Sequence, residues 1–416
     1  MKRIASLLRL AAVVALAAAP ASAAPLAAWV EMTSGGAELR LVTAATACPT
    51  ATVDGAPRPM TERAGPDEAF DNRVCTAPLR PGKHAVTADG TTLAAPAARP
   101  ARLVIIGDTG CRMKGVVFQG CNDGSDWPFP RVAALAAARR PDLVIHLGDY
   151  YYREIPCPRW ARRCAGSPYG DRWATWKAEV FDPAAPLLAA APWVFARGNH
   201  ETCDRGGGGW FRMLDGAAPA TACLARSPTF SVDIGGPVMW VVDGSNLEDF
   251  EPKSAKVAAW SETVRPALHG RHGWIVTHRP VWNPSRLGDL LGDGLINATE
   301  RQALKTQDLS GVDLILSGHV HNFASVSFAG RRPPQLVDGA GGDILDMQDT
   351  PPPAMGRPAI DGLPADVFTM GRFGYFVLDR RGTDWAGVFY TLDDRPAATC
   401  LLRRRALICR AARPPG

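Results

Sequence analysis

Long apolar runs are absent from most of this sequence of 416 residues, so no segment after the N-terminus is predicted to cross a membrane, which needs roughly 20 apolar residues. The one candidate, Leu10 to Ala19, is too short. It follows Lys2, Arg3 and Arg9 and precedes the small-residue sequence Ala21-Ser22-Ala23, as in a signal peptide. We therefore predict that residues 1–23 are a signal peptide and that the protein is exported, either periplasmic or secreted.

Net charge is also low. The formal charge of +5 includes Lys2, Arg3 and Arg9, so the chain without its signal peptide carries about +2. A strongly basic composition would point to nucleic acid or an anionic membrane as a partner, and this one does not. We expect neither partner, and the sequence leaves the oligomeric state open.

No CxxC pair occurs, although the chain has ten cysteines. Closely spaced cysteine pairs are typical of zinc sites, which are the competing interpretation here. Disulfides are favoured, because the cysteines are even in number and follow an export signal. Their spacing suggests nearest-neighbour pairs, without proving the connectivity: Cys48 with Cys75, Cys111 with Cys121, Cys157 with Cys164, Cys203 with Cys223, and Cys400 with Cys409.

Internal repeats of about 20 to 50 residues are absent as well. Residues 24–98 instead contain short alternating runs, such as Ala37 to Leu41, interrupted by the turn dipeptides Gly35-Gly36 and Asp54-Gly55. This pattern predicts a small all-β N-terminal domain. The stretch Ala94 to Pro100 is rich in proline and alanine and is typical of a linker, so the domain boundary is placed near its end.

Residues 101–416 show a different pattern, in which buried strands alternate with helical segments. Apolar runs typical of strands are Leu103 to Ile106, Leu143 to Leu147, Trp193 to Ala196, Val238 to Val242, Trp274 to Val276 and Leu314 to Leu316. Helix-prone segments are Val132 to Arg139 and Glu300 to Thr306, and closing strands are expected at Tyr375 to Leu378, Ala386 to Thr391 and Cys400 to Cys409. We predict an α/β catalytic domain, a two-sheet β-sandwich of mixed strand direction flanked by helices.

Five short motifs place polar side chains directly after predicted strands. They are GDTG from residue 107, GDYYY from 148, GNHE from 198, VTH from 276 and GHVH from 318. Each has a structural explanation when taken alone: Gly-Asp after a strand is often a turn, Asn199 could cap a loop, and His278 could be a hydrogen-bonded core residue. A purely structural role explains His319 and His321 less easily, because two imidazoles separated by a single residue can both turn toward one pair of ions.

Taken together, the five motifs predict a metal centre. Ligand sites in α/β sheets form beyond the carboxyl ends of the strands, where such loops converge. Carboxylate, amide and imidazole donors without thiolates suit iron, manganese or zinc. A shared carboxylate can bridge two ions about 3.5 to 4 Å apart, the separation used in two-metal phosphoryl chemistry.

The motifs, in this order, resemble those of the calcineurin-like metallophosphoesterases and in particular the purple acid phosphatases. The resemblance covers most of residues 101–342 and none of residues 24–98. The wider superfamily usually has a histidine two residues after the first aspartate, where this sequence has Gly110. Purple acid phosphatases instead have a tyrosine three residues after the second aspartate, where Tyr152 stands. The turn at residues 339–342 resembles a late loop of this family, and it lacks the Lys-Ser/Thr ending of a P-loop.

The resemblance implies two metal ions and seven protein ligands. Asp108, Tyr152 and His321 would hold one ion, expected to be ferric iron, since a phenolate is a hard anionic donor. Asn199, His278 and His319 would hold a divalent ion, either iron, zinc or manganese. Asp149 would bridge the two ions.

His200 is the implied catalytic residue, because in this family its position contacts the phosphoryl group or protonates the leaving oxygen. A hydrogen bond that supports Asn199 is the alternative. The family tends to carry further histidines after the fourth motif, but residues 279–296 contain none. The leaving-group acid and the substrate contacts are therefore left open, with Arg279 as a candidate for binding phosphate.

Residues near the motifs are also given roles. Tyr150 and Tyr151 are expected to pack, Glu201 to support its loop and Asp243 to form a turn, while packing is favoured over a cleft-lining role for Trp160, Trp173, Trp176 and Trp210. Cys111, Cys157 and Cys203 each follow a ligand-bearing motif. We hypothesise that their disulfides pin the loops around the metal centre.

The expected reaction is acid phosphatase-type hydrolysis of a small phosphate monoester by attack of a metal-bound hydroxide. Two alternatives are a manganese- or zinc-dependent phosphodiesterase or nucleotidase, and a noncatalytic phosphate-binding protein on the same scaffold. The sequence does not decide between monoester and diester substrates.

Overall fold

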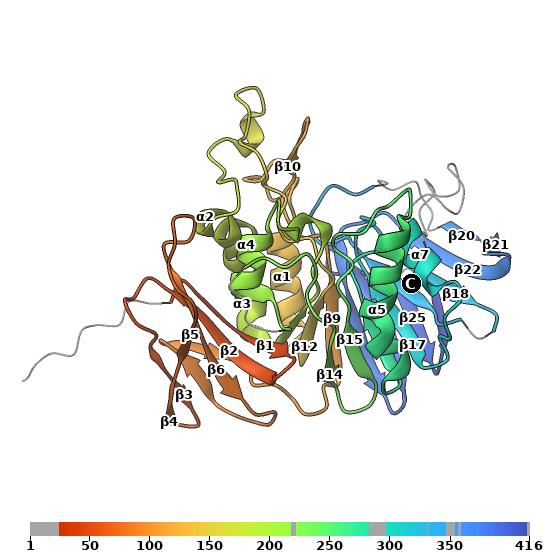
Figure 1. Ribbon diagram of the computed structural model, residues 1–416, viewed down its shortest axis with the longest axis horizontal. Coiled ribbons are helices and arrows are strands. Elements are labelled where there is room, and N and C mark those ends of the chain that lie inside the picture. The colour runs from red at the N-terminus through yellow and green to blue at the C-terminus, as the bar shows by residue number, and fades with distance from the viewer. Residues whose placement is uncertain are drawn as a thin grey trace, which may run out of the picture.

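The computed structural model describes residues 25–217, 222–282, 297–330, 332–346, 354–356 and 359–413. The predicted signal peptide lies outside these residues. Within them, two large β-sheets pack face to face, and helices cover the outer faces (Figure 1).

The first sheet has 11 strands in the order β26-β25-β24-β23-β9-β12-β13-β1-β2-β6-β5. In chain order these are β1 (Ala27–Thr33), β2 (Gly36–Thr43), β5 (Thr61–Ala64), β6 (Arg73–Leu79), β9 (Arg102–Ile106), β12 (Leu143–His146), β13 (Trp193–Phe195), β23 (Gly374–Arg381), β24 (Asp384–Thr391), β25 (Pro396–Arg403) and β26 (Ala406–Ala411). The central strands β9, β12 and β13 are parallel, so their carboxyl ends meet at one edge.

The second sheet runs in the order β14-β15-β16-β17-β19-β18-β22-β20. Its strands are β14 (Phe230–Asp233), β15 (Val238–Val241), β16 (Gly273–Val276), β17 (Val312–Ser317), β18 (Phe323–Phe328), β19 (Gln335–Asp338), β20 (Ala354–Gly356) and β22 (Leu363–Met370), and β21 (Ala359–Ile360) also pairs with β22. β15, β16, β17 and β19 are parallel and deliver a second set of carboxyl ends.

The alternation of side chains along the strands explains why both faces are apolar. In β9, Leu103 and Ile105 face the core between the sheets, whereas Val104 and Ile106 face the core under the helices. The helices over the first sheet are α1 (Phe129–Ala138) and α3 (Asp182–Ala190), and those over the second are α5 (Ser254–His269) and α7 (Ala298–Leu304). The predicted α/β sandwich is therefore confirmed.

Residues 27–93 contain only strands, as predicted. β3 (Thr50–Val53), β4 (Ala56–Pro59), β7 (Val86–Ala88) and β8 (Thr91–Leu93) form a small sheet of their own. β1, however, pairs in parallel with β13, so the N-terminal strands continue the first large sheet. The division of the chain near residue 100 into two domains stays a prediction.

The strands predicted before the five motifs all exist. The helix predicted at Val132 to Arg139 overlaps α1, and the helix predicted at Glu300 to Thr306 overlaps α7. The expected strand Cys400 to Cys409 is wrong in one respect, because the chain turns back between β25 and β26. Cys400 and Cys409 face each other across this hairpin and form a disulfide. The long helix α5 was not predicted, because its Lys, Glu and Arg residues make the apolar face of the helix hard to recognise in the sequence.

Five disulfides join the nearest-neighbour pairs that the spacing suggested. Disulfides are typical of proteins that fold in an oxidising compartment outside the cytosol. Among the helices of the described residues, none is long and apolar enough to cross a membrane.

Candidate metal centre

The five motifs meet where the two sets of parallel strands end. Asp108 follows β9, Asp149 follows β12, Asn199 follows β13, His278 follows β16, and His319 follows β17. Asp108, Asp149 and His319 have left-handed backbones, with φ of 54°, 57° and 66°. Such strained conformations are uncommon outside glycine and cluster at functional sites, where the surrounding structure holds them.

The Tyr152 hydroxyl is the meeting point of one group of side chains. It lies 2.9 Å from Oδ2 of Asp149, 3.3 Å from Oδ1 of Asp108 and 3.0 Å from Nε2 of His321. All four side chains are buried. One phenol proton can serve only one of these acceptors at a time, so a cation fits the donor set better than a proton does.

The ionisation of Tyr152 depends on that cation. Burial raises the pKa of Tyr152 well above its ordinary value, and the charges of Asp149 and Asp108 raise it further. A bound metal ion reverses this effect, because it stabilises the phenolate directly. The residues therefore fit a metal site.

A second group of donors lies on the other side of Asp149. Nε2 of His278 is 3.1 Å from Oδ1 of Asn199 and 3.1 Å from Oδ2 of Asp149. Ligand atoms of Asp149, His278 and His319 all lie within 4.8 Å of one another. The same Asp149 oxygen thus contacts both groups, as a bridging carboxylate requires.

Backbone carbonyls orient two of the imidazoles. Nδ1 of His278 donates to the Leu147 carbonyl at 2.7 Å, and Nδ1 of His321 donates to the Ile344 carbonyl at 2.7 Å. These bonds assign the proton to Nδ1 and leave Nε2 of each ring facing the centre. This is the arrangement by which proteins fix histidine ligands.

Gly110 lies so close to the ring of Tyr152 that there is no room for a side chain at position 110. A Cβ atom on Gly110 would lie 2.6 Å from the Tyr150 carbonyl oxygen and 2.7 Å from Cδ2 of Tyr152. Any side chain at position 110, including histidine, would therefore collide with the tyrosine ring. A histidine at position 110 is therefore excluded by the Tyr150 carbonyl as well as by the ring of Tyr152.

Two buried carboxylates hold the backbone of the second motif. Glu201 accepts from the backbone N–H groups of Gly198, Asp149, Tyr150 and Tyr151, at 2.8 to 3.1 Å. Glu179 accepts from Cys111 at 2.9 Å and from Tyr152 at 3.1 Å. Burial raises the pKa of both carboxyls to about 8. The loop-supporting role expected of Glu201 is confirmed.

His200 lies against the tyrosine, with ring centroids 3.7 Å apart. Its Nδ1 is 2.7 Å from Oε1 of Glu154, and its Nε2 is 3.8 Å from Oδ2 of Asp149. Burial lowers the pKa of His200 to about 4. Arg205 pairs with Glu154 and also donates to the Asn199 carbonyl at 2.8 Å.

Arg279 is buried and contacts the second donor group. Its Nη1 lies 3.1 Å from Nε2 of His319 and pairs with Asp249. A neutral imidazole has one lone pair on Nε2, so this contact and a metal ion exclude each other. Nε2 of His319 also lies 3.2 Å from Oδ1 of Asp249, so both members of this ion pair lie on the side of the ring that would face a metal ion. The phosphate contact of Arg279 stays a prediction.

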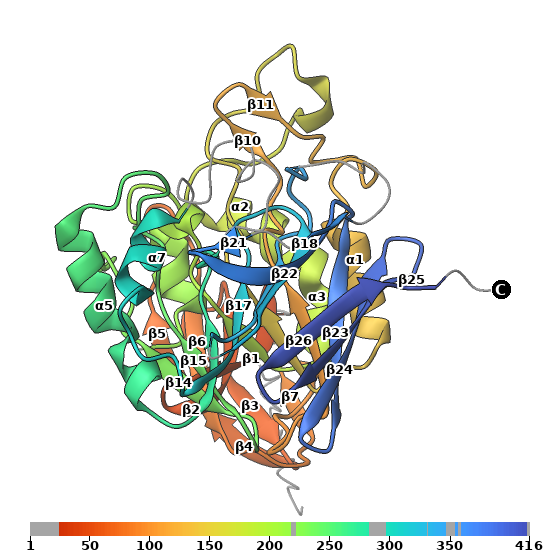
Figure 2. The ribbon, with the colours of Figure 1, turned by 90° about the vertical axis from the view of Figure 1, so that its right-hand side faces the viewer.

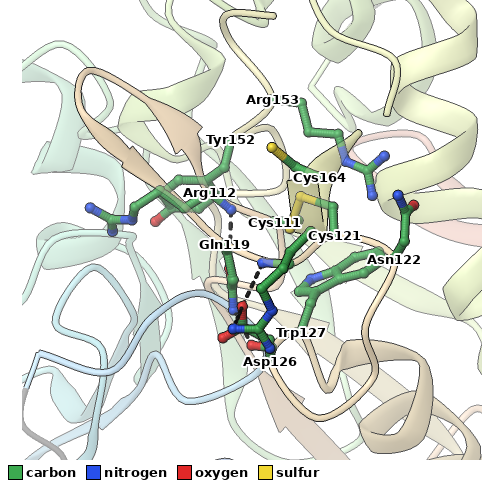
Figure 3. The surroundings of a disulfide bond; sticks show 12 residues. Cys111, Arg112, Gln119, Cys121, Asn122, Asp126, Trp127, Tyr152, Arg153 and Cys164 are labelled. Atoms are coloured by element: carbon green, nitrogen blue, oxygen red, sulfur yellow. Dashed lines mark hydrogen bonds and ion pairs between the residues drawn. A yellow bond between two sulfur atoms is a disulfide. The ribbon is translucent and has the colours of Figure 1, made fainter. Parts of the chain in front are cut away.

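The Cys111–Cys121 disulfide lies next to the tyrosine. Figure 3 shows Arg112 and Tyr152 together beside this disulfide. Arg112 donates to both oxygens of Asp343, and its guanidinium carbon is 5.4 Å from the Tyr152 ring centre. The hypothesis that disulfides pin loops near the centre fits this placement.

The sequence did not single out Glu154, Arg205, Arg112 or Asp343. The one signal was nearness to a motif, since Arg112 follows Cys111 and Glu154 comes two residues after Tyr152. Tyr150, Tyr151, Trp173, Trp176 and Trp210 are buried, as expected, and Asp243 binds Arg197 and two backbone N–H groups. Trp160 packs only at its edge, against Phe118, and is otherwise 71% exposed, so the packing expected of it is confirmed only in part.

Comparisons with known proteins agree with the geometry. The family model for calcineurin-like phosphoesterases matches residues 101–323. The structure of purple acid phosphatase PPD1 from yellow lupin (Lupinus luteus) seeds aligns with a TM-score of 0.59 and 15% identity, over 93% of this chain and 74% of that one. The structure of PhoD aligns with a TM-score of 0.55 and 11% identity, over 95% and 94%. At these identities the two likenesses show the fold alone, and no curated protein sequence matches.

Proposed function

Because this chain belongs to the calcineurin-like phosphoesterase family, we propose that it is an exported enzyme of the purple acid phosphatase type that hydrolyses phosphate monoesters. The observation that carries the proposal is the position of the Tyr152 hydroxyl within 3.3 Å of Asp108, Asp149 and His321. A tyrosine among these donors distinguishes the purple acid phosphatase type from its histidine-containing relatives. The steric exclusion at Gly110 supports the same assignment.

Two ions fit the two donor groups. Asp108, Tyr152 and His321 would hold ferric iron, Asn199, His278 and His319 would hold a divalent ion, and Asp149 would be shared. When bound, such ions lower the pKa of water and stabilise negative charge on a phosphoryl group.

His200 is the residue proposed to handle the leaving oxygen. Its Nδ1 lies 2.7 Å from Oε1 of Glu154 and its Nε2 lies 3.8 Å from Oδ2 of Asp149, on the side of the shared carboxylate. Nη2 of Arg205 is 2.9 Å from the same Nε2, so this arginine has to turn away before Nε2 holds a proton. Glu154 orients the ring and stabilises the imidazolium that carries this proton, as carboxylates do in other acid–base pairs. The leaving alkoxide takes the proton from Nε2 and departs as an alcohol.

Neighbouring cations complete the proposed site. Arg205 holds Glu154 in place and adds positive charge next to His200. Arg112, oriented by Asp343, adds positive charge next to Tyr152 and His321. Fixed charges of this kind stabilise a dianionic phosphoryl group without reorganising.

Metal analysis, a visible spectrum and ester assays test the proposal together. We expect one equivalent of iron, an absorption band from the tyrosinate, and turnover of monoesters above diesters. A colourless protein with two zinc or manganese ions that prefers diesters would support a phosphodiesterase instead. Absence of turnover on every ester, with both metals loaded, would leave a noncatalytic phosphate-binding protein.

Export is proposed from the N-terminal residues together with the disulfides. Residues 1–23 carry the signal-peptide pattern, and all ten cysteines are paired. Expression of the full chain followed by mass analysis should find the mature N-terminus at Ala24. Fractionation of the same cells would separate a periplasmic location from a secreted one.

A further inference from the structure

A rigid hairpin stands beside the metal centre. β10 (Met113–Lys114) and β11 (Val117–Phe118) pair with each other and rise above the body of the molecule (Figure 2). The Cys111–Cys121 disulfide closes the base of this hairpin. The base is also tied to the late glycine turn, because the Gln119 side chain donates to the Gly342 carbonyl at 2.9 Å.

The second motif holds the hairpin from the other side. The backbone N–H of Met113 donates to the Tyr152 carbonyl at 3.0 Å, and that of Glu154 donates to the Met113 carbonyl at 3.1 Å. Phe118, which pairs with Met113 at the end of the hairpin nearest the disulfide, meets the ring of Trp160 edge to face, with centroids 5.3 Å apart. A side chain on β10 is therefore held at a fixed place relative to Tyr152 and Glu154.

Three arginines around the centre are each neutralised by a carboxylate. Arg112 pairs with Asp343, Arg205 with Glu154, and Arg279 with Asp249. Arg112 and Arg205 therefore act as oriented groups on one phosphoryl group at the centre, and each pair carries no net charge with which to bind a second anionic group of a substrate. Additional positive charge has to come from another residue.

Lys114 on β10 supplies that charge. It is half-buried, and no carboxylate of the described residues lies within ion-pair distance of its ammonium group. Its pKa is lowered by burial and next by the positive charge of Arg205, while Glu154 and Asp149 act in the opposite sense. Met113 forms a parallel bridge with Arg153, so Lys114 and Glu154, the residues that follow each of them, point to the same face of this pairing. Lys114 thus lies on the side of Glu154 without forming an ion pair with it.

We propose that Lys114 is a specificity-determining residue that binds a second phosphate group of the substrate, so that the preferred substrates are organic bisphosphates. This inference rests on the proposed phosphoesterase function and names the substrate class of the same site. The backbone of Lys114 is already held by the hairpin, so little conformational entropy of the backbone is lost when a ligand binds. The charge of an unpaired lysine can then distinguish a substrate with two phosphate groups from a substrate with one. A substrate with one phosphate would use the metal centre alone.

The test compares fructose 1,6-bisphosphate with fructose 6-phosphate. In Lys114→Gln we expect KM for the bisphosphate to rise about tenfold, the size of one charge-assisted hydrogen bond, with kcat and the monophosphate KM changed by less than about twofold. Lys114→Arg should restore most of the selectivity. Lys83→Gln, which removes an exposed lysine of the N-terminal region, is the matched control and should change neither KM.

An equilibrium measurement makes the test independent of turnover. Calorimetry on the metal-loaded protein should show that Lys114→Gln weakens binding of inorganic pyrophosphate about tenfold and of inorganic phosphate by less than about twofold. Equal losses for both ligands, or no loss for either, would overturn the proposal. If no ester is hydrolysed at all, the proposed function fails, and the calorimetry still decides the role of Lys114.

Discussion

The two halves of the proposed metal centre share Asp149 but are built differently. In the tyrosine half, formed by Asp108, Tyr152 and His321, the side chains of Asp108 and His321 are 0% and 5% exposed. In the amide half, formed by Asn199, His278 and His319, the side chain of His319 is 15% exposed and its Nε2 already contacts Arg279. His278 is 0% exposed as well, so the halves differ mainly at His319, which is partly exposed and faces a competing group.

The difference follows from what surrounds each half. A disulfide, the buried carboxylate of Glu179 and the late glycine turn hold the tyrosine half in place. The amide half lacks these supports and is bordered by two charged pairs, Arg205 with Glu154 and Arg279 with Asp249, whereas the tyrosine half is bordered by one, Arg112 with Asp343. A preorganised, desolvated ligand set binds a metal more tightly than one that must first release a hydrogen bond. We infer that the tyrosine half keeps its ion and that the amide half exchanges it.

The largest expected effect comes from removing the ligand that both halves share. Asp149→Asn should lower turnover by at least about 1000-fold, since loss of a single electrostatic contact to the transition state alone can cost that much. Both metals should also be depleted, as measured by elemental analysis. Full metal content and full turnover in this variant would refute the bridging role.

Separate substitutions in the two halves should give different losses. Tyr152→Phe should remove the visible absorption and most of the iron, because the phenolate ligand is gone. Asn199→Ala should instead retain iron and colour while the divalent ion is lost, and each variant should lose about 100-fold in activity. A Tyr152→Phe protein that keeps its visible absorption would contradict the assignment of Tyr152 as the ligand of the iron.

A smaller effect should come from the competitor in the amide half. Arg279→Gln removes one of the two groups next to Nε2 of His319, the other being Asp249 at 3.2 Å, so the divalent ion should bind about fivefold more tightly, the size of one modest hydrogen bond. Titration of iron-loaded protein with zinc measures this affinity. Arg301→Gln, which breaks a pair with Asp361 away from the centre, is the matched control. Unchanged or weaker zinc binding in Arg279→Gln would contradict the competition.

The smallest effect on the centre should come from the disulfides. Replacing Cys111 and Cys121 by serine should lower the free energy of unfolding by about 2 to 3 kcal/mol and also speed the loss of iron to a chelator. Replacing Cys400 and Cys409 by serine should lower the free energy of unfolding by a similar amount, because the two disulfides close loops of similar length. The rate of iron loss should stay unchanged in this variant. Equal iron loss in both double variants would show that the nearby disulfide does not support the tyrosine half.

The sequence by itself determined the strands and the ligand motifs. Buried parallel strands are short apolar runs, and the polar residue that ends each run is adjacent to it in the chain, so Asp108, Asp149, Asn199 and His278 could be found by local inspection. The disulfide pairs were equally local. The substitution of tyrosine for histidine was also visible, although its steric reason at Gly110 was not.

Only the tertiary structure decided how these residues meet. The contact of Tyr152 with His321 joins positions 169 residues apart, and that of Asp108 with the His319 backbone joins positions 211 apart. Arg112, Glu154, Arg205 and Asp249 gain their proposed roles through contacts with residues distant in sequence, and no local pattern distinguishes them from other charged residues. Periodicity encodes which face of a strand is buried, whereas the partner of a charged side chain depends on which loops the completed sheets bring together.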